Sequence, residues 1–403
     1  MDSAILNDPF LLAKKHLIEL TRGLPSGTVP IPVIQDLSSM HPDWPVWPDV
    51  ALSDLIGPPN VRLKEIDLRW LHRFRATITL LGWLSAQLGG PKGGPSALSL
   101  VVERAPILGH RGWGAVSAGG SCRILSTSDG QIAANLPRVE DQLSVAAWLD
   151  APIEGTDWAS IEKEVQQVTS SELLSRAKLL GMPMSVVGET KVPSGFEYNI
   201  GKEIQLKQKP RVVDLSSMWA GPLCSWYLMR CGAEVIKIES MLRPEKLRNR
   251  PDFFYQRLNQ GKEIIPLDFS SSIDLERLRN IIRGSDIIIE GSRPRALKHL
   301  GIDAQEEVER GAIWCSITGY GRRWNPHRVG FGDDAAAGAN LLAEINGSLW
   351  FMGDAIADPI TGATAATLVL GYWLGCSSAL LDLGLSPTAA LYSQGLLSRA
   401  SSF

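Results

Sequence analysis

The segment RVVDLSSMWAGPLCSWYLMRCGAEVIKIE, residues 211–239, decides the fold of this chain. Two short apolar runs, at 211–216 and 234–239, enclose a stretch with helical spacing that Gly232 closes. Neighbouring parallel strands need a crossover of this kind, usually a helix. The segment therefore predicts a β-α-β unit.

The same alternation continues toward the C-terminus. Strand-like runs follow at 263–269, 286–292 and 312–321, and an amphipathic helix is expected at 272–284. Short apolar strands separated by helices predict an α/β fold, with a doubly wound, mostly parallel sheet covered on both faces.

Ligands of such sheets bind at the carboxyl ends of the strands, so the loops after Ser216, Glu239, Glu290 and Thr318 are expected around one crevice. The first loop, 216–222, has one glycine, whereas a dinucleotide needs G-x-G-x-x-G and a triphosphate needs G-x-x-x-x-G-K-[ST]. Cofactors of these two types are therefore not favoured.

The chain changes character near residue 205, and we divide it into four parts. Residues 1–105 are an unassigned N-terminal segment, and 106–198 form a small α+β domain with helices expected at 158–168 and 171–180. The polar stretch 199–211 is expected to be a linker. Residues 212–403 form the large Rossmann-like domain.

The composition is that of an ordinary globular protein, with 403 residues, 44% hydrophobic content and a net charge of -3. The Lys and Arg residues are scattered, so the sequence does not predict a nucleic-acid-binding surface. The five cysteines lack the spacing of a metal site, which predicts reduced thiols and no bound metal. No secretory signal is recognisable, which favours the cytoplasm. The uncharged run 359–381 is long enough for a bilayer, but its Thr, Gly and Ser favour a buried or interface helix.

Five motifs together are more specific than any one of them: VVDLSSMWAGPLCSWYLMRCGAEVIKIE, LNQGKEIIPLDF, DIIIEGSRPRALKHLGI, WCSITGYG and ADPITGATAA. In this order and spacing, over about 211–370, they resemble the family III CoA-transferases of the CaiB/BaiF type. That group includes formyl-CoA and carnitine CoA-transferases and the 2-methylacyl-CoA racemases. The resemblance implies CoA and acyl-CoA as substrates, no prosthetic group, and an interlaced dimer or a complex with a related chain.

The ranges 112–143 and 172–187 resemble the small domain of the same family, which normally follows the catalytic part. Here they precede it. The segment order is therefore expected to be permuted, or to be one part of a duplicated arrangement. Residues 1–105 resemble nothing that we can name.

Exchange of CoA between two acids needs a carboxylate that attacks a thioester and then holds the acyl group and CoA in turn. The family resemblance implies that Asp358 is this nucleophile. Local sequence alone favours a different role for Asp358, because Asp before Pro359 is the signature of a helix N-cap. Asp354 is the nearest competitor but lacks a following Thr-Gly pair, and Gly362 suits either a close substrate approach or a helix crossing.

The resemblance also implies a set of CoA contacts. These are Ser217, Met218, Ala220, Leu258, Asn259, Gln260, Lys262, Gly291, Ser292, Arg293, His299 and Asp334. Gly291, Ser292 and His299 depart from the family's usual residues, and Arg293, Arg295 and Lys298 would compensate unless they are solvated surface charges.

Gly119 and Gly120 match a glycine loop that closes over the transferase site, although an ordinary turn fits them as well. The racemase branch has a histidine where this chain has Asp333, and His327 is the nearest substitute. The sequence thus favours a CoA-transferase, with a racemase or a non-catalytic CoA-binding or assembly subunit as alternatives.

Overall fold

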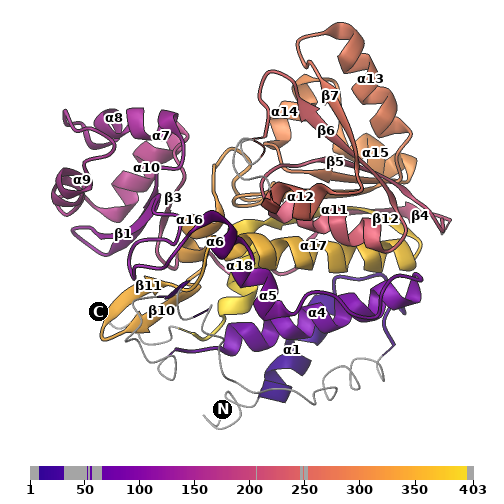
Figure 1. Cartoon of the computed structure of the whole chain (residues 1–403), viewed down its shortest axis with the longest axis horizontal. Coiled ribbons are helices and arrows are strands. Elements are labelled where there is room, and N and C mark those ends of the chain that lie inside the picture. Colours follow the sequence, from indigo (N-terminus) through magenta and orange to yellow (C-terminus); the bar gives the residue numbers. More distant parts are fainter. Residues whose placement is uncertain are drawn as a thin grey trace.

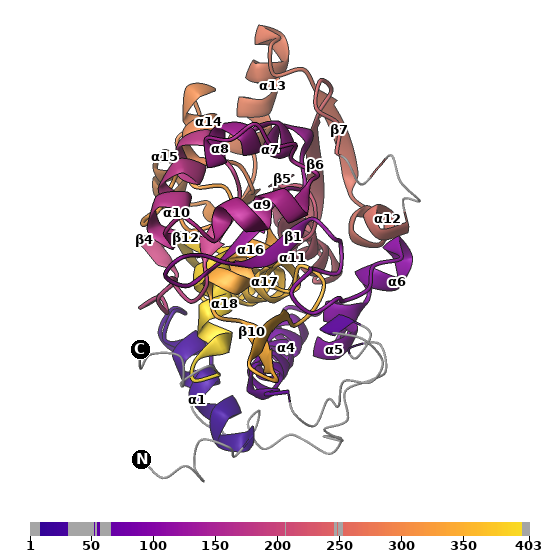
Figure 2. The same ribbon diagram turned by 90° about the vertical axis from the view of Figure 1, so that its left-hand side faces the viewer.

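The computed structural model describes residues 9–30, 66–205, 207–245 and 253–396, together with the single positions 52, 55, 56 and 248. Figure 1 shows the large sheet and the helices that cover it at the upper right, and a small domain, in magenta, at the left. Figure 2, turned by 90°, places the small domain in front of this sheet.

Within the described residues, the large sheet has seven strands in the order β4-β12-β9-β8-β5-β6-β7. All neighbours from β12 to β7 pair in parallel, and only β4 runs antiparallel, against β12. The strands are β4 Glu197–Glu203, β5 Arg211–Leu215, β6 Glu234–Ser240, β7 Glu263–Leu267, β8 Ile287–Glu290, β9 Ile313–Thr318 and β12 Ser377–Gly384. The doubly wound order spreads both ways from β5, which confirms the expected fold class.

Helices cover both faces of the sheet because its strands are apolar on both sides. Val212 packs into the core beneath α11 (Ala220–Arg230) and α17 (Ala357–Leu374), whereas Val213 faces the opposite layer. That layer contains α13 Ser272–Arg283, α14 Pro294–His299 and α15 Ala304–Arg310. Helix α12, Phe253–Asn259, leads into β7.

The uncharged run 359–381 divides into two elements. Most of it lies in α17, and after a turn at Cys376, where φ is 50°, the chain enters β12. Helix α17 is buried inside this single chain by its packing on α11, α4 (Arg69–Gln87) and α18 (Leu385–Ser393). An interface is therefore not needed to explain its composition. Among the described helices, none is long and apolar enough to cross a membrane.

The small domain contains a three-stranded antiparallel sheet in the order β1-β2-β3. Its core surrounds Trp148, whose indole N–H donates to the Leu173 carbonyl at 3.0 Å. Its elements are β1 Cys122–Ser126, β2 Gln131–Asn135, α7 Val139–Leu143, α8 Val145–Leu149, α9 Trp158–Val165, α10 Ser170–Leu180 and β3 Met184–Val186. The two helices expected in this part thus correspond to α9 and α10.

The described part of 1–105 packs against the large domain. Helices α1 (Pro9–Thr21) and α4 run below α17 in Figure 1, and they share its hydrophobic core. Two short helices follow, α5 Ala97–Val102 and α6 Arg104–Leu108.

Three shorter elements follow β9: α16 Gly332–Gly338, and the paired strands β10 Leu342–Ile345 and β11 Ser348–Phe351. The range 199–211 differs from the expected linker because its first residues belong to strand β4. This strand is mostly exposed, and a polar sequence is compatible with the edge of a sheet.

Candidate active site

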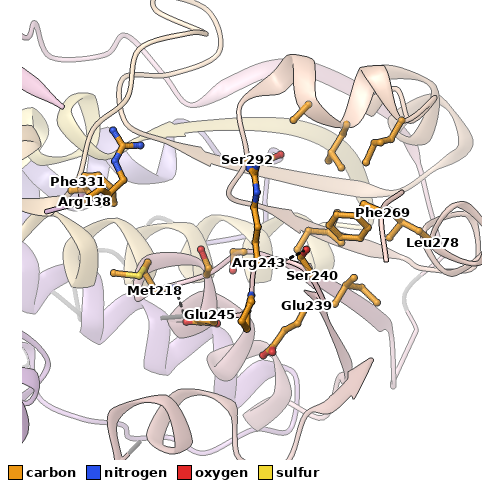
Figure 3. Close-up of a pocket in the computed structure, with 18 of the residues that line it drawn as sticks. Arg138, Met218, Glu239, Ser240, Arg243, Glu245, Phe269, Leu278, Ser292 and Phe331 are labelled. Atoms are coloured by element: carbon orange, nitrogen blue, oxygen red, sulfur yellow. Dashed lines mark hydrogen bonds between the residues drawn. The ribbon is translucent and has the colours of Figure 1, made fainter. Parts of the chain in front are cut away.

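A cavity of about 450 Å³ lies at the carboxyl ends of β5, β6 and β8 (Figure 3). The loop after each of these strands contributes to its wall, as the sheet topology predicted. The small-domain side adds Arg138, whose guanidinium lies 5.7 Å from the ring centre of Phe331. The polar residues of the lining include Arg138, Ser216, Ser217, Glu239, Ser240, Arg243, Glu245 and Ser292.

The loop after β5 is held in an unusual conformation. Met218 has a φ of 69°, in the left-handed region, and its N–H donates to Glu245 Oε1 at 2.8 Å. The Lys237 ammonium donates to the Ser216 carbonyl at 2.8 Å and pairs with Glu245 Oε2 at 3.1 Å. These contacts offset the strain of a positive φ at a residue with a side chain. The loop is therefore pre-formed.

Lys262 supports this loop from inside the protein. Its Nζ lies 3.1 Å from Asp214 Oδ2, 3.0 Å from Asn259 Oδ1 and 2.8 Å from Ser225 Oγ. Burial opposes ionisation of Asp214, but the ammonium groups of Lys262 and Lys237 outweigh it and hold the pKa of Asp214 well below its usual range.

The geometry of Lys262 differs from the CoA contact that the resemblance implied. Its side chain is fully buried, and it donates to protein oxygens that include the Pro222 carbonyl at 3.0 Å. Asn259 is buried beside it, and neither residue lines the cavity. The spacing of Asn259 and Lys262 in the sequence does not indicate whether the lysine side chain faces the cavity or the protein interior.

Asp358 lies in the first turn of α17, and Ile356 is the N-cap residue, without a side-chain cap bond. The capping interpretation of Asp358 is therefore wrong. Every other residue from 357 to 373 is buried, and Asp358 alone keeps partial exposure. Its carboxylate accepts the backbone N–H of Ala220, and burial among protein groups raises its pKa to about 7, with the Arg104 charge opposing that rise.

Asp354, the competing aspartate, is bound by two other side chains. Arg104 binds it with two N–H groups, with Nε 2.7 Å from Oδ2, and His110 Nδ1 lies 3.2 Å from Oδ1. Burial opposes its ionisation, but the pairing with Arg104 prevails and holds the pKa of Asp354 well below its usual range. Asp354 is a paired anion, whereas Asp358 is bound by a backbone amide.

Two glycines permit this arrangement. A Cβ atom at Gly332 would stand 2.2 Å from Asp358 Oδ2, so the carboxylate packs directly on the backbone of α16. A Cβ atom at Gly362 would stand 2.6 Å from the Ala220 carbonyl oxygen. Of the two interpretations of Gly362, the structure therefore supports the close helix crossing, between α17 and α11.

The aspartates that begin α16 are buried beside the site. Asp334 accepts Asn135 Nδ2 at 2.9 Å and the Tyr320 hydroxyl at 3.1 Å, and burial raises its pKa to about 6. Asp333 accepts the Ala355 N–H at 2.8 Å, and burial raises its pKa to about 7. Because Asn135 ends β2, Asp334 connects the small domain to the start of α16, on which Asp358 packs.

The glycine pair lies near Asp354, with His110 between them. A Cβ atom at Gly119 would stand 3.4 Å from His110 Cε1, and His110 contacts Asp354. Gly120 has a φ of 77° and donates its N–H to the Ser117 carbonyl at 2.8 Å. The pair therefore forms a turn, and that turn packs against a residue of the site.

The remaining predicted contacts are distributed unevenly. Ser217, Met218 and Ser292 line the cavity, and the Ser292 hydroxyl is buried without a hydrogen-bond partner among the described residues. Leu258 is buried in the core, whereas Gln260 and His299 are exposed. Gly291 packs on Ser216, Arg293 is partly buried, and neither lines the cavity.

Sequence reasoning missed Arg104, His110, Arg138 and Arg243. The first three precede the motif-bearing segment, and only the tertiary structure brings them to the site. Arg243 lies only four residues after Glu239, at the end of β6, so the expected loop after that strand was the signal available for it.

The fold and the site define an α/β protein with a ligand cavity at the carboxyl edge of its sheet. Residues 208–373 match the model of CoA-transferase family III. The resemblance seen in the five motifs is thereby confirmed over this segment. The match covers α11, α17 and the strands β5 to β9.

Curated relatives carry names of the same group. An acyl-CoA transferase of Fusarium pseudograminearum is 28% identical over 38% of this chain and 38% of its own length. A succinyl-CoA:mesaconate CoA-transferase of Haloarcula hispanica is 29% identical over 30% and 34%. A formyl-CoA:oxalate CoA-transferase of Escherichia coli is 32% identical over 27% and 29%. The chain thus spans about a third of the length of these relatives.

A solved structure of a CAIB/BAIF family protein from Brucella suis is 25% identical, with a TM-score of 0.41, over 47% of this chain and 55% of its own.

Among the described residues, no group of His, Cys, Asp and Glu side chains is arranged to hold a metal ion. All five cysteines are free.

Proposed function

We propose that this chain transfers CoA between an acyl-CoA and a carboxylic acid through a covalent intermediate on Asp358. One observation carries the proposal: in the matched segment, Asp358 is the single accessible residue of a helix that is otherwise buried from 357 to 373. An apolar residue would pack better than a carboxyl group at such a position, so packing does not explain the aspartate.

The chemistry needs only a carboxylate that exchanges acyl partners. An Asp358 oxygen attacks the thioester carbonyl and expels the CoA thiolate, which gives a mixed anhydride. The thiolate then attacks the Asp358 carbonyl, releases the donor acid and leaves an aspartyl thioester. The acceptor carboxylate repeats the first step on this thioester, and the thiolate takes the new acyl group and frees Asp358.

One loop connects this carboxylate with the cavity. Met218 lines the cavity, and Ala220, two residues later, donates its N–H to Asp358. A pantetheine chain that follows this loop would bring its thioester toward Asp358. The Ala220 amide orients the carboxylate and stabilises its negative charge.

The cavity has the surface that the rest of CoA needs. Its apolar wall, which includes Phe269 and Ile238, suits the adenine and pantetheine, and Arg243 suits a phosphate. The unpartnered Ser292 hydroxyl offers one further hydrogen bond. The names of the relatives make formyl-CoA and succinyl-CoA the first donors to test, with dicarboxylic acids as acceptors.

The test is mass spectrometry of the full chain after mixing with these acyl-CoAs. We expect a hydroxylamine-sensitive adduct on the peptide that contains Asp358, and CoA exchange with added acid. Asp358→Asn should abolish both while the protein stays folded, since Ile356 and not Asp358 caps the helix. Retained CoA exchange in Asp358→Asn would contradict the proposal.

The same experiment separates the alternatives. A racemase would exchange the α-proton of a 2-methylacyl-CoA with deuterated solvent and form no adduct. A non-catalytic subunit would bind CoA and do neither.

We also propose a homodimer, or a complex with a related chain, on the family resemblance alone. A monodisperse monomer in light scattering at micromolar concentration would refute this proposal.

A further inference from the structure

Arg104 reaches the reaction centre from outside the matched segment. It opens helix α6, more than one hundred residues before residue 208, and binds both carboxylate oxygens of Asp354. The Asp354 side chain is fully buried, and that of Arg104 keeps 11% exposure. A bidentate pair in this setting fixes the geometry of both partners.

The same guanidinium also touches the opposite side of the site. It lies 4.8 Å from the ring centre of Trp219, the residue before Ala220. Asp354 precedes the turn into α17, and Ala220 begins α11, so Arg104 joins the two backbone segments that enclose the Asp358 carboxyl.

The charges around Asp358 come from three elements. Arg104 belongs to α6, Asp354 to the connection before α17, and Asp333 and Asp334 to α16; His110 adds a contact to Asp354. The carboxylates of Asp354 and Asp334 oppose ionisation of Asp358, and Arg104 favours it. The arginine is paired with Asp354, so its effect on Asp358 is partly neutralised.

We propose that Arg104 is a positioning residue for the proposed nucleophile: it holds both backbone segments around Asp358 and acts as the counter-charge of its carboxylate. This inference rests on the proposed function of Asp358. It means that the N-terminal part of the chain, which the family model does not cover, supplies part of the reaction centre.

Two variants should act in opposite directions. Arg104→Met removes the counter-charge and leaves Asp354 in place, so the Asp358 carboxyl should titrate at higher pH by about one unit or more. Asp354→Asn keeps the shape, removes a carboxylate that opposes ionisation of Asp358 and leaves the Arg104 charge uncompensated, so Asp358 should titrate at lower pH. A purely structural role would not give opposite shifts.

The measurement is carboxyl ¹³C NMR of the full chain labelled at aspartate, with Asp358→Asn to assign the resonance. Arg73→Met is the matched control, because Arg73 is also buried and donates to backbone carbonyls, at residues 392 and 394. We expect no shift there. Arg104→Lys keeps the positive charge, so Asp358 should titrate close to its pH in the unaltered protein. This variant is used in place of Arg104→Met if the latter does not fold.

Shifts in the same direction for Arg104→Met and Asp354→Asn, or none in either, would overturn the inference. Its failure is distinguishable from failure of the proposed function. Absence of any adduct in the unaltered protein contradicts the function, while the NMR titration still reports on Arg104. If the adduct forms, its rate against pH should shift with the titration in each variant.

Discussion

Gly332 and Asp358 lie in direct contact: a Cβ atom at position 332 would stand 2.2 Å from Asp358 Oδ2 and 2.5 Å from the Ala355 carbonyl oxygen. The carboxylate is thus seated on bare backbone. The absence of a side chain at 332 fixes where the carboxylate can be.

Gly332→Ala should therefore displace the Asp358 carboxylate. We expect the rate of adduct formation to fall at least about a hundredfold, because displacements near 1 Å at a reacting group have effects of this size. Gly338→Ala, on the same helix, is the control, since its Cβ would lie 3.0 Å from Ser185 Cβ and away from Asp358. Equal adduct rates in the two alanine variants would contradict the role of Gly332.

Lys262 should matter for stability and not for CoA contact. Lys262→Met leaves the Asp214 carboxylate buried without a main partner, and we expect the free energy of unfolding to fall by about 3–5 kcal/mol in urea titrations. Pairing it with Asp214→Asn should recover part of the loss. If Lys262→Met stays as stable as the unaltered protein but loses CoA affinity, the ligand contact implied by the family is right after all.

Arg243 should contribute to CoA binding. Arg243→Glu is expected to weaken the calorimetric affinity for CoA roughly tenfold or more, through loss of a charge-assisted contact of about 1.5–3 kcal/mol. Arg295→Glu is the control, because Arg295 is exposed on neighbouring α14 and does not line the cavity. Similar losses in both would point to general electrostatic attraction instead of a site.

Stability should fall as the pH rises from 5 to 8. Burial raises the pKa of Asp333 to about 7, above its value in the unfolded chain, so its stabilising contribution is complete below about pH 4 and is lost as pH rises through 7. In urea unfolding at pH 5 and 8, Asp333→Asn should reduce this fall by roughly 1–3 kcal/mol. An unchanged pH dependence in the variant would show that Asp333 is ionised throughout.

The α/β architecture was predictable because it follows from local patterns. Each strand of the large sheet from β5 to β9 is a short apolar run, and each helix between them has its own spacing and closing residue. Strand β12 was not predicted because it continues the uncharged run that begins in α17. Strand β4 was not predicted because its sequence is polar and it lies at the edge of the sheet.

By itself, the sequence determined the strands β5 to β9, the family resemblance and the choice of Asp358 as the candidate nucleophile, because each depends on residues close together in the chain. The tertiary structure alone decided that Asp354 is paired with Arg104, that Lys262 lies beneath the loop, and that Asp358 alone keeps partial exposure between residues 357 and 373. These outcomes depend on side chains from distant segments competing for the same buried space and charge. Periodicity and motif spacing do not encode which partner each buried charge receives.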